Sequence, residues 1–468
     1  MSKFRTKVLN SIISCLCAIY AFQACGDDES TGIVRIPYDP SQPVKVTKFF
    51  PDSGRIRDKV ILEGTNFGTD PSKIRVWFNN KQAAVIGSTG EQLYAIVPRM
   101  PGDTCTVAIA VGDGTQLGRD SVVFEQKFKY SITVSVTTVC GDGTTINRPG
   151  ALEQAQIAPF QMDVDQNGNI FVGVELGFAG GANKIDCGLV RINEEENTME
   201  LISNLGNSNN GTSTIQEPRL EGLNADKFTG KLYAKQRAAL SYVVIDPSEH
   251  WVPRLKNWSF KTNPKHPEYD NDRPTVTGSY MGYNMFNKKC YTRFSSGHIA
   301  EIDPETGEGM IIFKTPQISC TTIGVDVDPK HPNMIYFSGY NSGSVAHGIW
   351  RLDLNDPDNS WTRLNAPTSS GYRDGPIEQA MFNTPYGLRF DMDGLMYISD
   401  QGNSLIRSYD PETGLVSTVL GIPGQPGFAN GGREEAKFNG ATSVGVDLNG
   451  NVYVADRSNR RIRKLAIE

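Results

Sequence analysis

The stretch Val446-Asp-Leu-Asn-Gly-Asn-Val-Tyr-Val454 is nearly a copy of Val164-Asp-Gln-Asn-Gly-Asn-Ile-Phe-Val172. A second motif is also duplicated, because Val136-Thr-Thr-Val-Cys-Gly141 matches Val416-Ser-Thr-Val-Leu-Gly421. In both copies of the first motif, apolar segments flank an Asn-Gly pair, the sequence of a two-residue hairpin turn. Self-similarity at a period of roughly 40 residues, built from short strands, predicts a β-propeller.

The clearest repeat unit is Pro385-Tyr-Gly-Leu-Arg-Phe-Asp-Met-Asp-Gly-Leu-Met-Tyr-Ile-Ser-Asp-Gln-Gly-Asn-Ser-Leu-Ile-Arg-Ser-Tyr-Asp410, and a second copy runs from Ser443 to Arg463. Both units resemble NHL repeats, which form the blades of β-propellers. Four more degenerate copies precede them, at about residues 160–203, 220–260, 278–315 and 322–364. The resemblance implies an all-β array of six blades over residues 131–468.

The last repeat stops after its third strand, Arg461-Ile-Arg-Lys-Leu465. The segment 131–139 precedes the first blade and matches the fourth strand of the fifth blade. We therefore expect it to pair with Arg461–Leu465 and close the ring, which hides two strand edges that would otherwise favour aggregation.

Residues 44–130 have the pattern of a small β-sandwich, in which short alternating segments are separated by Gly, Pro and Asn turns. The motifs Phe50-Pro-Asp-Ser-Gly54, Leu62-Glu-Gly-Thr-Asn-Phe-Gly68 and Val97-Pro98 resemble an IPT/TIG domain. That family is immunoglobulin-like, and its members serve mostly as spacers or as dimerisation and binding modules. We interpret this segment as a stalk.

The N-terminus has the features of an export signal. Lys3, Arg5 and Lys7 precede an apolar run that is too short to span a bilayer. The run ends before Cys25 in a sequence that resembles a bacterial lipobox, which implies a signal peptide at residues 1–24 and acylation of Cys25. An ordinary signal peptide or a membrane anchor is the alternative. Residues 25–43 are predicted to be a flexible tether whose acidic start resembles a surface-export signal, so we expect an outer-membrane protein facing the cell exterior.

Composition excludes several classes of function. The net charge of −6 argues against nucleic acid as a partner. Five cysteines remain after Cys25, with wide spacing that fits neither a disulfide framework nor a zinc site. The segment Asp163–Gly168 resembles the start of a calcium loop, but Val174 stands where the loop needs Glu, and the Asn-Gly pair suits a hairpin. We predict neither a metal nor a cofactor.

No local motif indicates catalysis. None of the five histidines has metal-ligand spacing, and the paired Asp residues flank predicted hairpins, where Asp forms turns. A propeller lyase or hydrolase whose catalytic residues converge from separate blades stays open as an alternative.

One face of the predicted propeller carries the candidate ligand contacts. In a four-stranded blade, the connection between strands two and three shares a face with the connection between blades. Residues at these positions, which include aromatic rings beside charged groups, suit the apolar faces and the hydroxyls of sugar rings. Packing between blades is the alternative role for each. The residues are Phe160, Glu175, Arg237, Tyr283, Arg293, Tyr340, Tyr386, Asp400 and Asp456.

The whole architecture resembles that of accessory lipoproteins from glycan-utilisation systems. This resemblance implies non-catalytic capture of a polysaccharide or glycoconjugate for an outer-membrane transporter complex. The alternatives are a protein–protein scaffold or adhesin that uses the same face, and a propeller enzyme that acts on glycans. Because one fold supports many functions, the residues of the site must decide among them.

Overall fold

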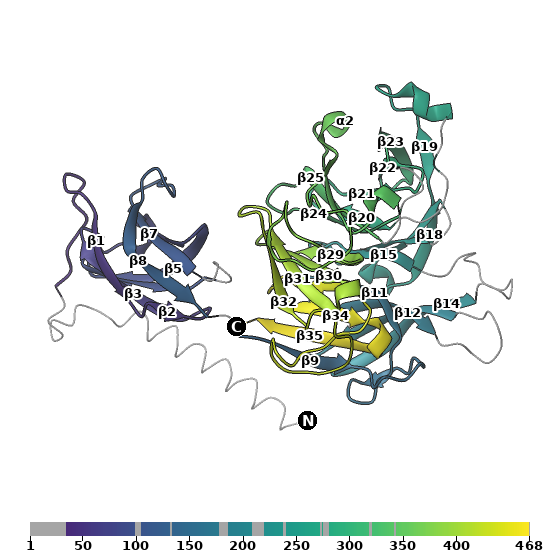
Figure 1. The fold of residues 1–468 in the computed structure, drawn as a ribbon, viewed down its shortest axis with the longest axis horizontal. Helices are drawn as coiled ribbons and strands as arrows, with labels where there is room; N and C mark the ends of the chain where they lie inside the picture. Colours follow the sequence, from purple (N-terminus) through teal and green to yellow (C-terminus); the bar gives the residue numbers. More distant parts are fainter. Residues whose placement is uncertain are drawn as a thin grey trace, which may run out of the picture. The chain divides into compact units, whose positions relative to one another are not determined.

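The computed structural model describes residues 34–98, 104–131, 133–176, 186–207, 220–236, 240–271, 274, 280–317, 321–340 and 343–467. Its contacts divide the chain into two compact units, the second of which runs from Thr133 to Ile467. Nearly all regular structure is β-strand, as the sequence predicts (Figure 1). None of the helices within the described ranges is long and apolar enough to cross a bilayer.

The N-terminal unit is built from eight strands in the order β1-β3-β6-β5-β4-β7-β8-β2. The strands surround a core to which Phe49, Phe78 and Phe128 contribute buried rings. Phe128 packs edge-to-face on Phe78 with ring centroids 5.0 Å apart. The strands are β1 (Lys45–Phe50), β2 (Ser53–Gly54), β3 (Lys59–Thr65), β4 (Ile74–Phe78), β5 (Lys81–Ser88), β6 (Gln92–Ile96), β7 (Thr104–Val111) and β8 (Val122–Tyr130).

The second unit is a six-bladed β-propeller, and each blade is a sheet of four or five strands. Listed from the inner to the outer strand, blade 1 comprises β11 (Pro159–Val164), β12 (Ile170–Leu176), β13 (Asp186–Asn193) and β14 (Thr198–Asn207). Blade 2 comprises β15 (Leu220–Ala225), β16 (Leu232–Gln236), β17 (Ser241–Ile245) and β18 (Pro253–Asn257). Blade 3 comprises β20 (Met281–Asn284), β21 (Lys289–Arg293), β22 (His298–Ile302) and β23 (Glu308–Lys314).

The remaining blades follow the same order. Blade 4 comprises β24 (Thr322–Val327), β25 (Met334–Gly339), β26 (Ile349–Asp353) and β27 (Thr362–Arg363), with the short helix α2 (Pro357–Ser360) between its last two strands. Blade 5 comprises β29 (Pro385–Phe390), β30 (Met396–Asp400), β31 (Leu405–Asp410) and β32 (Leu415–Leu420). Blade 6 comprises β33 (Ala441–Val446), β34 (Val452–Asp456), β35 (Arg461–Ile467) and β9 (Val134–Cys140). Blades 1, 3 and 5 each have a fifth, outermost strand: β10 (Gly150–Ala151), β19 (Ser259–Lys261) and β28 (Gly375–Pro376).

The N-terminal strand of the propeller closes the ring, which confirms the predicted pairing. β9 runs antiparallel to β35, with Val136 opposite Leu465 and Val134 opposite Ile467. The outer strand of blade 6 therefore comes from a segment that precedes blade 1 in sequence. This exchange pairs both ends of the array and leaves no open edge at the junction.

The inner hairpins of the blades form as the Asn-Gly and Asp-Gly pairs predict. In blade 1, Asp165 Oδ1 accepts the backbone N–H groups of Asn167 and Asn169, at 2.8 and 2.9 Å. Gly168 completes the turn with a φ of 77°, a conformation that side chains disfavour. Since the turn itself uses the Asp165 carboxylate, the Asp163–Gly168 motif is explained as hairpin structure.

Candidate functional site

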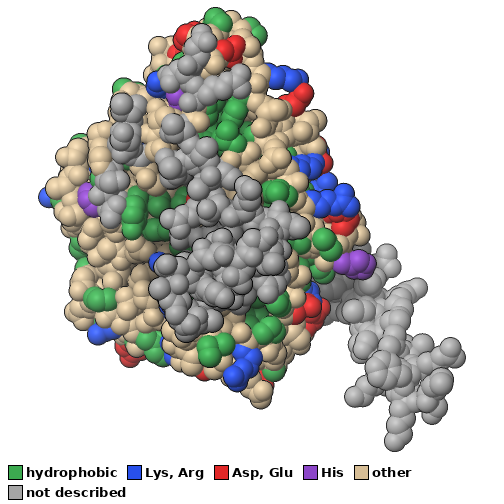
Figure 2. All heavy atoms as spheres, turned by 90° about the vertical axis from the view of Figure 1, so that its right-hand side faces the viewer, with side chains coloured by type: hydrophobic (Ala, Val, Ile, Leu, Met, Phe, Trp, Pro, Cys, Tyr) green, Lys and Arg blue, Asp and Glu red, His purple; other side chains and the backbone are tan. Residues whose placement is uncertain are grey.

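One face of the propeller carries both the connections between strands two and three and those between blades. β35 is the third strand of blade 6, and in Figure 1 its arrow ends on the left, near the C-terminus. The face with the strand-two ends is therefore the right-hand side of the propeller. Figure 2 views this side, where hydrophobic side chains (green) reach the surface at several places among polar ones. We call it the binding face.

A group of aromatic rings lies where the inner strands begin. Phe160, Tyr280, Ile323 and Tyr386 form a buried cluster, and the partly buried Tyr340 packs against it. We call these five residues the axial aromatic cluster. They come from blades 1, 3, 4 and 5, so only closure of the ring brings them together.

The rings of this cluster are in contact in a continuous series. The centroid of Tyr386 lies 6.3 Å from that of Phe160, 6.0 Å from that of Tyr280 and 5.4 Å from that of Tyr340, with edge-to-face geometry in each pair. The hydroxyl oxygens of Tyr280 and Tyr386 are 2.9 Å apart and share a hydrogen bond. At the other end, the guanidinium of Arg457 lies over the Phe160 ring, 5.1 Å from its centroid.

Irregular backbone at the start of the inner strands positions these rings. The pairing of the first and second strands shifts register at this level in blades 1, 2, 4, 5 and 6. Bulges of this kind re-aim side chains relative to a regular strand. Hydroxyl groups then fix the backbone: Ser338 donates to the carbonyl of Tyr386 at 2.6 Å, and Thr442 donates to that of Phe160 at 2.6 Å.

Blade 2 contributes charge at the same level instead of a ring. Glu221 lies immediately before the register shift of β15 and is opposite Lys235 of β16 in the strand register. Both side chains are buried, and the ammonium of Lys235 donates to the carbonyl of Gln236 at 3.0 Å. Burial lowers the pKa of Lys235, and the nearby charge of Glu221 opposes that change.

A second charged group lies further along the inner strands, and we call it the axial ion cluster. Asp163 accepts from the ammonium of Lys227 at 2.9 Å and lies 3.4 Å from Nε of Arg389. Burial alone would raise the pKa of Asp163, but the charges of Arg389 and Lys227 hold it below its usual value. Asp326 accepts the backbone N–H of Phe390 at 2.8 Å, and burial raises its pKa to about 6.

Between these two clusters the axis is almost filled. A small cavity lined by Gln161, Gly222, Ile323, Gly387 and Arg389 has room for about one water molecule. Close approach of the inner strands explains the glycines, because a Cβ on Gly222 would lie 2.3 Å from the carbonyl oxygen of Met281. This cavity among the described residues is therefore too small to hold a sugar.

The structure brings three of the predicted contacts together, namely Phe160, Tyr340 and Tyr386 in the axial aromatic cluster. Tyr283 lies elsewhere, because it stacks on Tyr233 at 4.5 Å and donates to Asp226 at 3.1 Å. Asp226 belongs to a hairpin between first and second strands, which lies on the opposite face.

Arg293, Asp400 and Asp456 are fully buried and serve blade packing. The Arg293 guanidinium donates to Oγ1 of Thr315 at 2.9 Å. Asp400 pairs with Arg407 at 3.0 Å, and Asp456 pairs with Arg463 at 2.7 Å. A ligand role for these three side chains stays a prediction.

The other predicted residues lie outside the described part of the chain. This holds for Cys25, for Arg237 and for the side chain of Glu175, whose backbone belongs to β12. Sequence reasoning missed Tyr280, Glu221 and Lys235. Tyr280 immediately precedes β20 and lies three residues before the predicted Tyr283. Its position just before an inner strand is the sequence feature that could have identified it.

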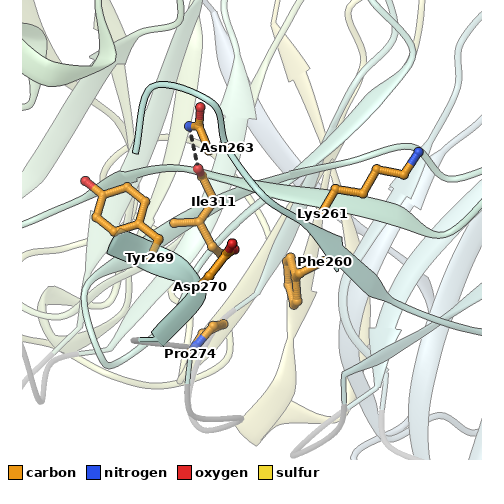
Figure 3. A pocket seen from close by; sticks show the side chains of 7 residues that line it. All are labelled: Phe260, Lys261, Asn263, Tyr269, Asp270, Pro274 and Ile311. Carbon is orange, nitrogen blue, oxygen red and sulfur yellow. Dashed lines mark hydrogen bonds between the residues drawn. The ribbon is translucent and has the colours of Figure 1, made fainter. Parts of the chain in front are cut away.

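The described ranges contain no group of three or more His, Cys, Asp or Glu side chains arranged to hold a metal ion. A separate crevice beside β19, at the outer edge of blade 3, is lined by Phe260, Tyr269, Asp270, Pro274 and Ile311, with Asn263 donating to the Ile311 carbonyl at 2.8 Å (Figure 3). It too has room for only about one water molecule, and the Tyr269 hydroxyl points away from it. We assign no ligand to this crevice.

The fold and the comparisons with known proteins agree on the two domains of the chain. Residues 43–130 match the IPT/TIG domain family, and a six-bladed propeller with NHL-like repeats follows. Within the chain, 52 residues are 42% identical to NHL repeat-containing protein 2 of Bos taurus, and 93 residues are 32% identical to the chloroplastic protein SUPPRESSOR OF QUENCHING 1 of Arabidopsis thaliana. These segments cover 11% and 20% of this chain but only 7% and 9% of those two proteins, respectively.

Solved structures from Bacteroides match nearly the whole chain. A protein of unknown function from Bacteroides thetaiotaomicron is 22% identical with a TM-score of 0.67, and the match covers 92% of this chain and 100% of that one. An auxiliary nutrient binding protein from the same species is 19% identical with a TM-score of 0.54, covering 92% and 99%. One from Bacteroides ovatus is 20% identical with a TM-score of 0.55, covering 92% and 100%. At these identities the matches establish the fold, which the two units of this chain share with those proteins.

Proposed function

We propose that this protein binds a polysaccharide or glycoconjugate without catalysis, through the axial aromatic cluster on the binding face of the propeller. The observation that carries the proposal is the series of contacting rings from Phe160 through Tyr386 to Tyr340, with the hydroxyls of Tyr280 and Tyr386 among them. Ring faces stack on the apolar C–H surfaces of sugars, while hydroxyls and charged groups bind sugar hydroxyls. The auxiliary nutrient binding proteins of the same fold support a role in ligand capture.

Affinity electrophoresis tests this proposal. The purified protein is run in native gels that contain dextran, starch, mannan, inulin, pectin or chondroitin sulfate, and we expect at least one gel to retard it without releasing sugar products. Tyr340→Ala removes a partly exposed ring of the cluster and should weaken binding by about fivefold or more. Tyr372→Ala is the matched control, because this tyrosine is exposed on the outside of blade 5, where its hydroxyl bonds Thr418 at 3.0 Å.

The outcomes separate the alternatives. Equal retardation of the Tyr340→Ala and wild-type proteins would show that the cluster is not the site. Failure of every gel would refute carbohydrate capture for these polymers. Accumulation of reducing ends or unsaturated sugars over time would instead establish a propeller enzyme.

A role as a protein scaffold is the second candidate, because the face opposite the binding face exposes apolar side chains. Phe228, Phe286, Met392 and Leu448 lie on the hairpins between first and second strands, and each is more than a third exposed. The rings of Phe228 and Phe286 pack edge-to-face at 6.1 Å. Exposed apolar groups gathered on one face favour a protein partner. Cross-linking to outer-membrane proteins that is lost on Phe228→Asp, while glycan retardation persists, would support this second role.

We further propose that Cys25 is acylated and anchors the protein in the outer membrane, facing the cell exterior, where it serves a transporter complex. The lipobox-like sequence before Cys25 and the acidic residues after it support this assignment. Metabolic labelling with an alkyne fatty acid should mark the wild-type protein but not Cys25→Ala. External protease should digest the protein on intact cells, and full protection would contradict a surface location.

A further inference from the structure

Side-chain donors from the same blade hold the connection between β25 and β26 in blade 4. Arg363 donates to the carbonyl of Ala346 at 3.0 Å, and Asn365 donates to that of His347 at 3.0 Å. The indole N–H of Trp350 donates to the carbonyl of Val345 at 3.3 Å. Three successive carbonyls, from Val345 to His347, are thus fixed by the outer strands of the same blade. Such anchoring preorganises whatever side chain the connection presents.

The side chain presented there is His347, which adjoins the axial aromatic cluster through two hydrogen bonds, one from its backbone and one to its imidazole. Its own N–H donates to the carbonyl of Tyr340 at 3.0 Å. Its Nδ1 lies 3.0 Å from the backbone nitrogen of Thr384, two residues before Tyr386. His347 therefore bridges the ends of two segments that each supply a ring to the cluster.

The bond to Thr384 decides the tautomer of the imidazole. A backbone nitrogen can only donate, so Nδ1 must accept, and the proton of the neutral ring is on Nε2. Nε2 has no hydrogen-bond partner among the described residues, and the side chain is partly exposed. Burial lowers the pKa of His347, and the nearby charge of Arg363 lowers it further, so the ring stays neutral at physiological pH.

We propose that His347 is a ligand-contact residue, and that its Nε2–H donates a hydrogen bond to an acceptor oxygen of a sugar bound on the axial aromatic cluster. This inference rests on the proposed function and adds a residue that determines specificity. At the opposite end of the ring series, the Arg457 guanidinium lies over Phe160. A ligand that lies along the rings must present an acceptor oxygen, from a hydroxyl or a carboxylate, to His347.

The substitution His347→Asn isolates this donor. The amide oxygen of Asn can accept the Thr384 N–H in place of Nδ1, and Asn tolerates the positive φ of 55° at this position. The Nε2–H donor is lost together with the ring, while the bond to the Thr384 N–H can remain. Arg460→Asn is the matched control, because Arg460 occupies the corresponding turn of blade 6 with a φ of 54°.

We expect His347→Asn to weaken retardation in the polysaccharide gels by about five- to tenfold, with an unchanged melting temperature, while Arg460→Asn binds as the wild type does. A reduction confined to pectin and chondroitin sulfate identifies the acceptor as a carboxylate or sulfate, and a reduction in dextran or starch identifies a hydroxyl. Wild-type retardation of His347→Asn would overturn the inference and leave the proposed function intact.

A ligand-free measurement keeps the inference testable even if no gel retards the wild type, which would overturn the proposed function. Nitrogen-15 NMR of the histidine rings, assigned by the signal that His347→Asn removes, reports the tautomer directly. We expect the neutral Nε2-protonated form at neutral pH. A neutral ring protonated on Nδ1 would refute the donor role, because its Nε2 carries no hydrogen, and a charged ring would contradict the acceptor role of Nδ1 toward Thr384.

Discussion

Blades 5 and 6 contain the same buried ion pair in two different settings. Asp456 pairs with Arg463 at 2.7 Å, and both side chains are fully buried. Asp456 also accepts from Asn459 and from the backbone of Asn439, each at 2.8 Å. Asp400 makes the equivalent bonds in blade 5. We predict that Asp456→Asn destabilises the propeller by about 3–5 kcal/mol, because it leaves a buried guanidinium without a counter-charge.

The arginines of the two ion pairs, Arg407 and Arg463, differ in the charge of their second side-chain partner. Arg407 also pairs with Asp374 at 2.7 Å, so Asp400→Asn leaves it one carboxylate. Arg463 has only the neutral Asn430 amide at the corresponding place, at 2.8 Å. Since a hydrogen bond to a charged group contributes about 1.5–3 kcal/mol, Asp400→Asn should cost less than its counterpart by a similar amount.

Urea unfolding of the full-length variants measures this difference in unfolding free energy. The fluorescence of the four propeller tryptophans and circular dichroism monitor the unfolding. The double variant Asp456→Asn, Arg463→Met should recover part of the loss, because it removes the unpaired charge as well. Equal costs for Asp400→Asn and Asp456→Asn, or a larger cost for Asp400→Asn, would refute the reasoning.

Two further predictions concern the axis and the rim. Gly222→Ala should lower the free energy of unfolding by about 2–4 kcal/mol, because the new Cβ clashes with the backbone of the next inner strand at a φ of 69°. Gly414→Ala is the control: its φ is 70°, but no atom lies close to the new Cβ, so it should cost only about 1–2 kcal/mol. Similar urea midpoints for the two variants would contradict this account. His266 lies 3.0 Å from both Glu268 and Asp358, which raise its pKa above the ordinary 6.5 although burial opposes them. Its contribution to stability is therefore complete below the ordinary pKa and lost as the pH rises through the folded-state pKa, so His266→Gln should destabilise at low pH and have little effect once the pH exceeds the folded-state pKa.

Much of the fold is readable from the sequence, because its signals are local. The Asn-Gly turns, the alternating strands and the NHL-like repeats each depend on neighbouring residues. The closing strand was also predictable, since the missing fourth strand of blade 6 matches the segment before blade 1, and β9 pairs with β35 as expected. The candidate site was predictable only in part: Phe160, Tyr340 and Tyr386 meet, but the third blade supplies Tyr280 instead of Tyr283.

The sequence by itself determined the kind of blade, the number of blades and the face on which Phe160, Tyr340 and Tyr386 lie, because strand alternation and turn chemistry act over a few residues. Only the tertiary structure decided which side chains face the axis and which form buried ion pairs within a blade. A bulge at the start of an inner strand changes the direction of a side chain, and the charges of Asp400 and Asp456 are paired by arginines seven residues further on. Both outcomes depend on packing between strands, which periodicity along one strand does not encode.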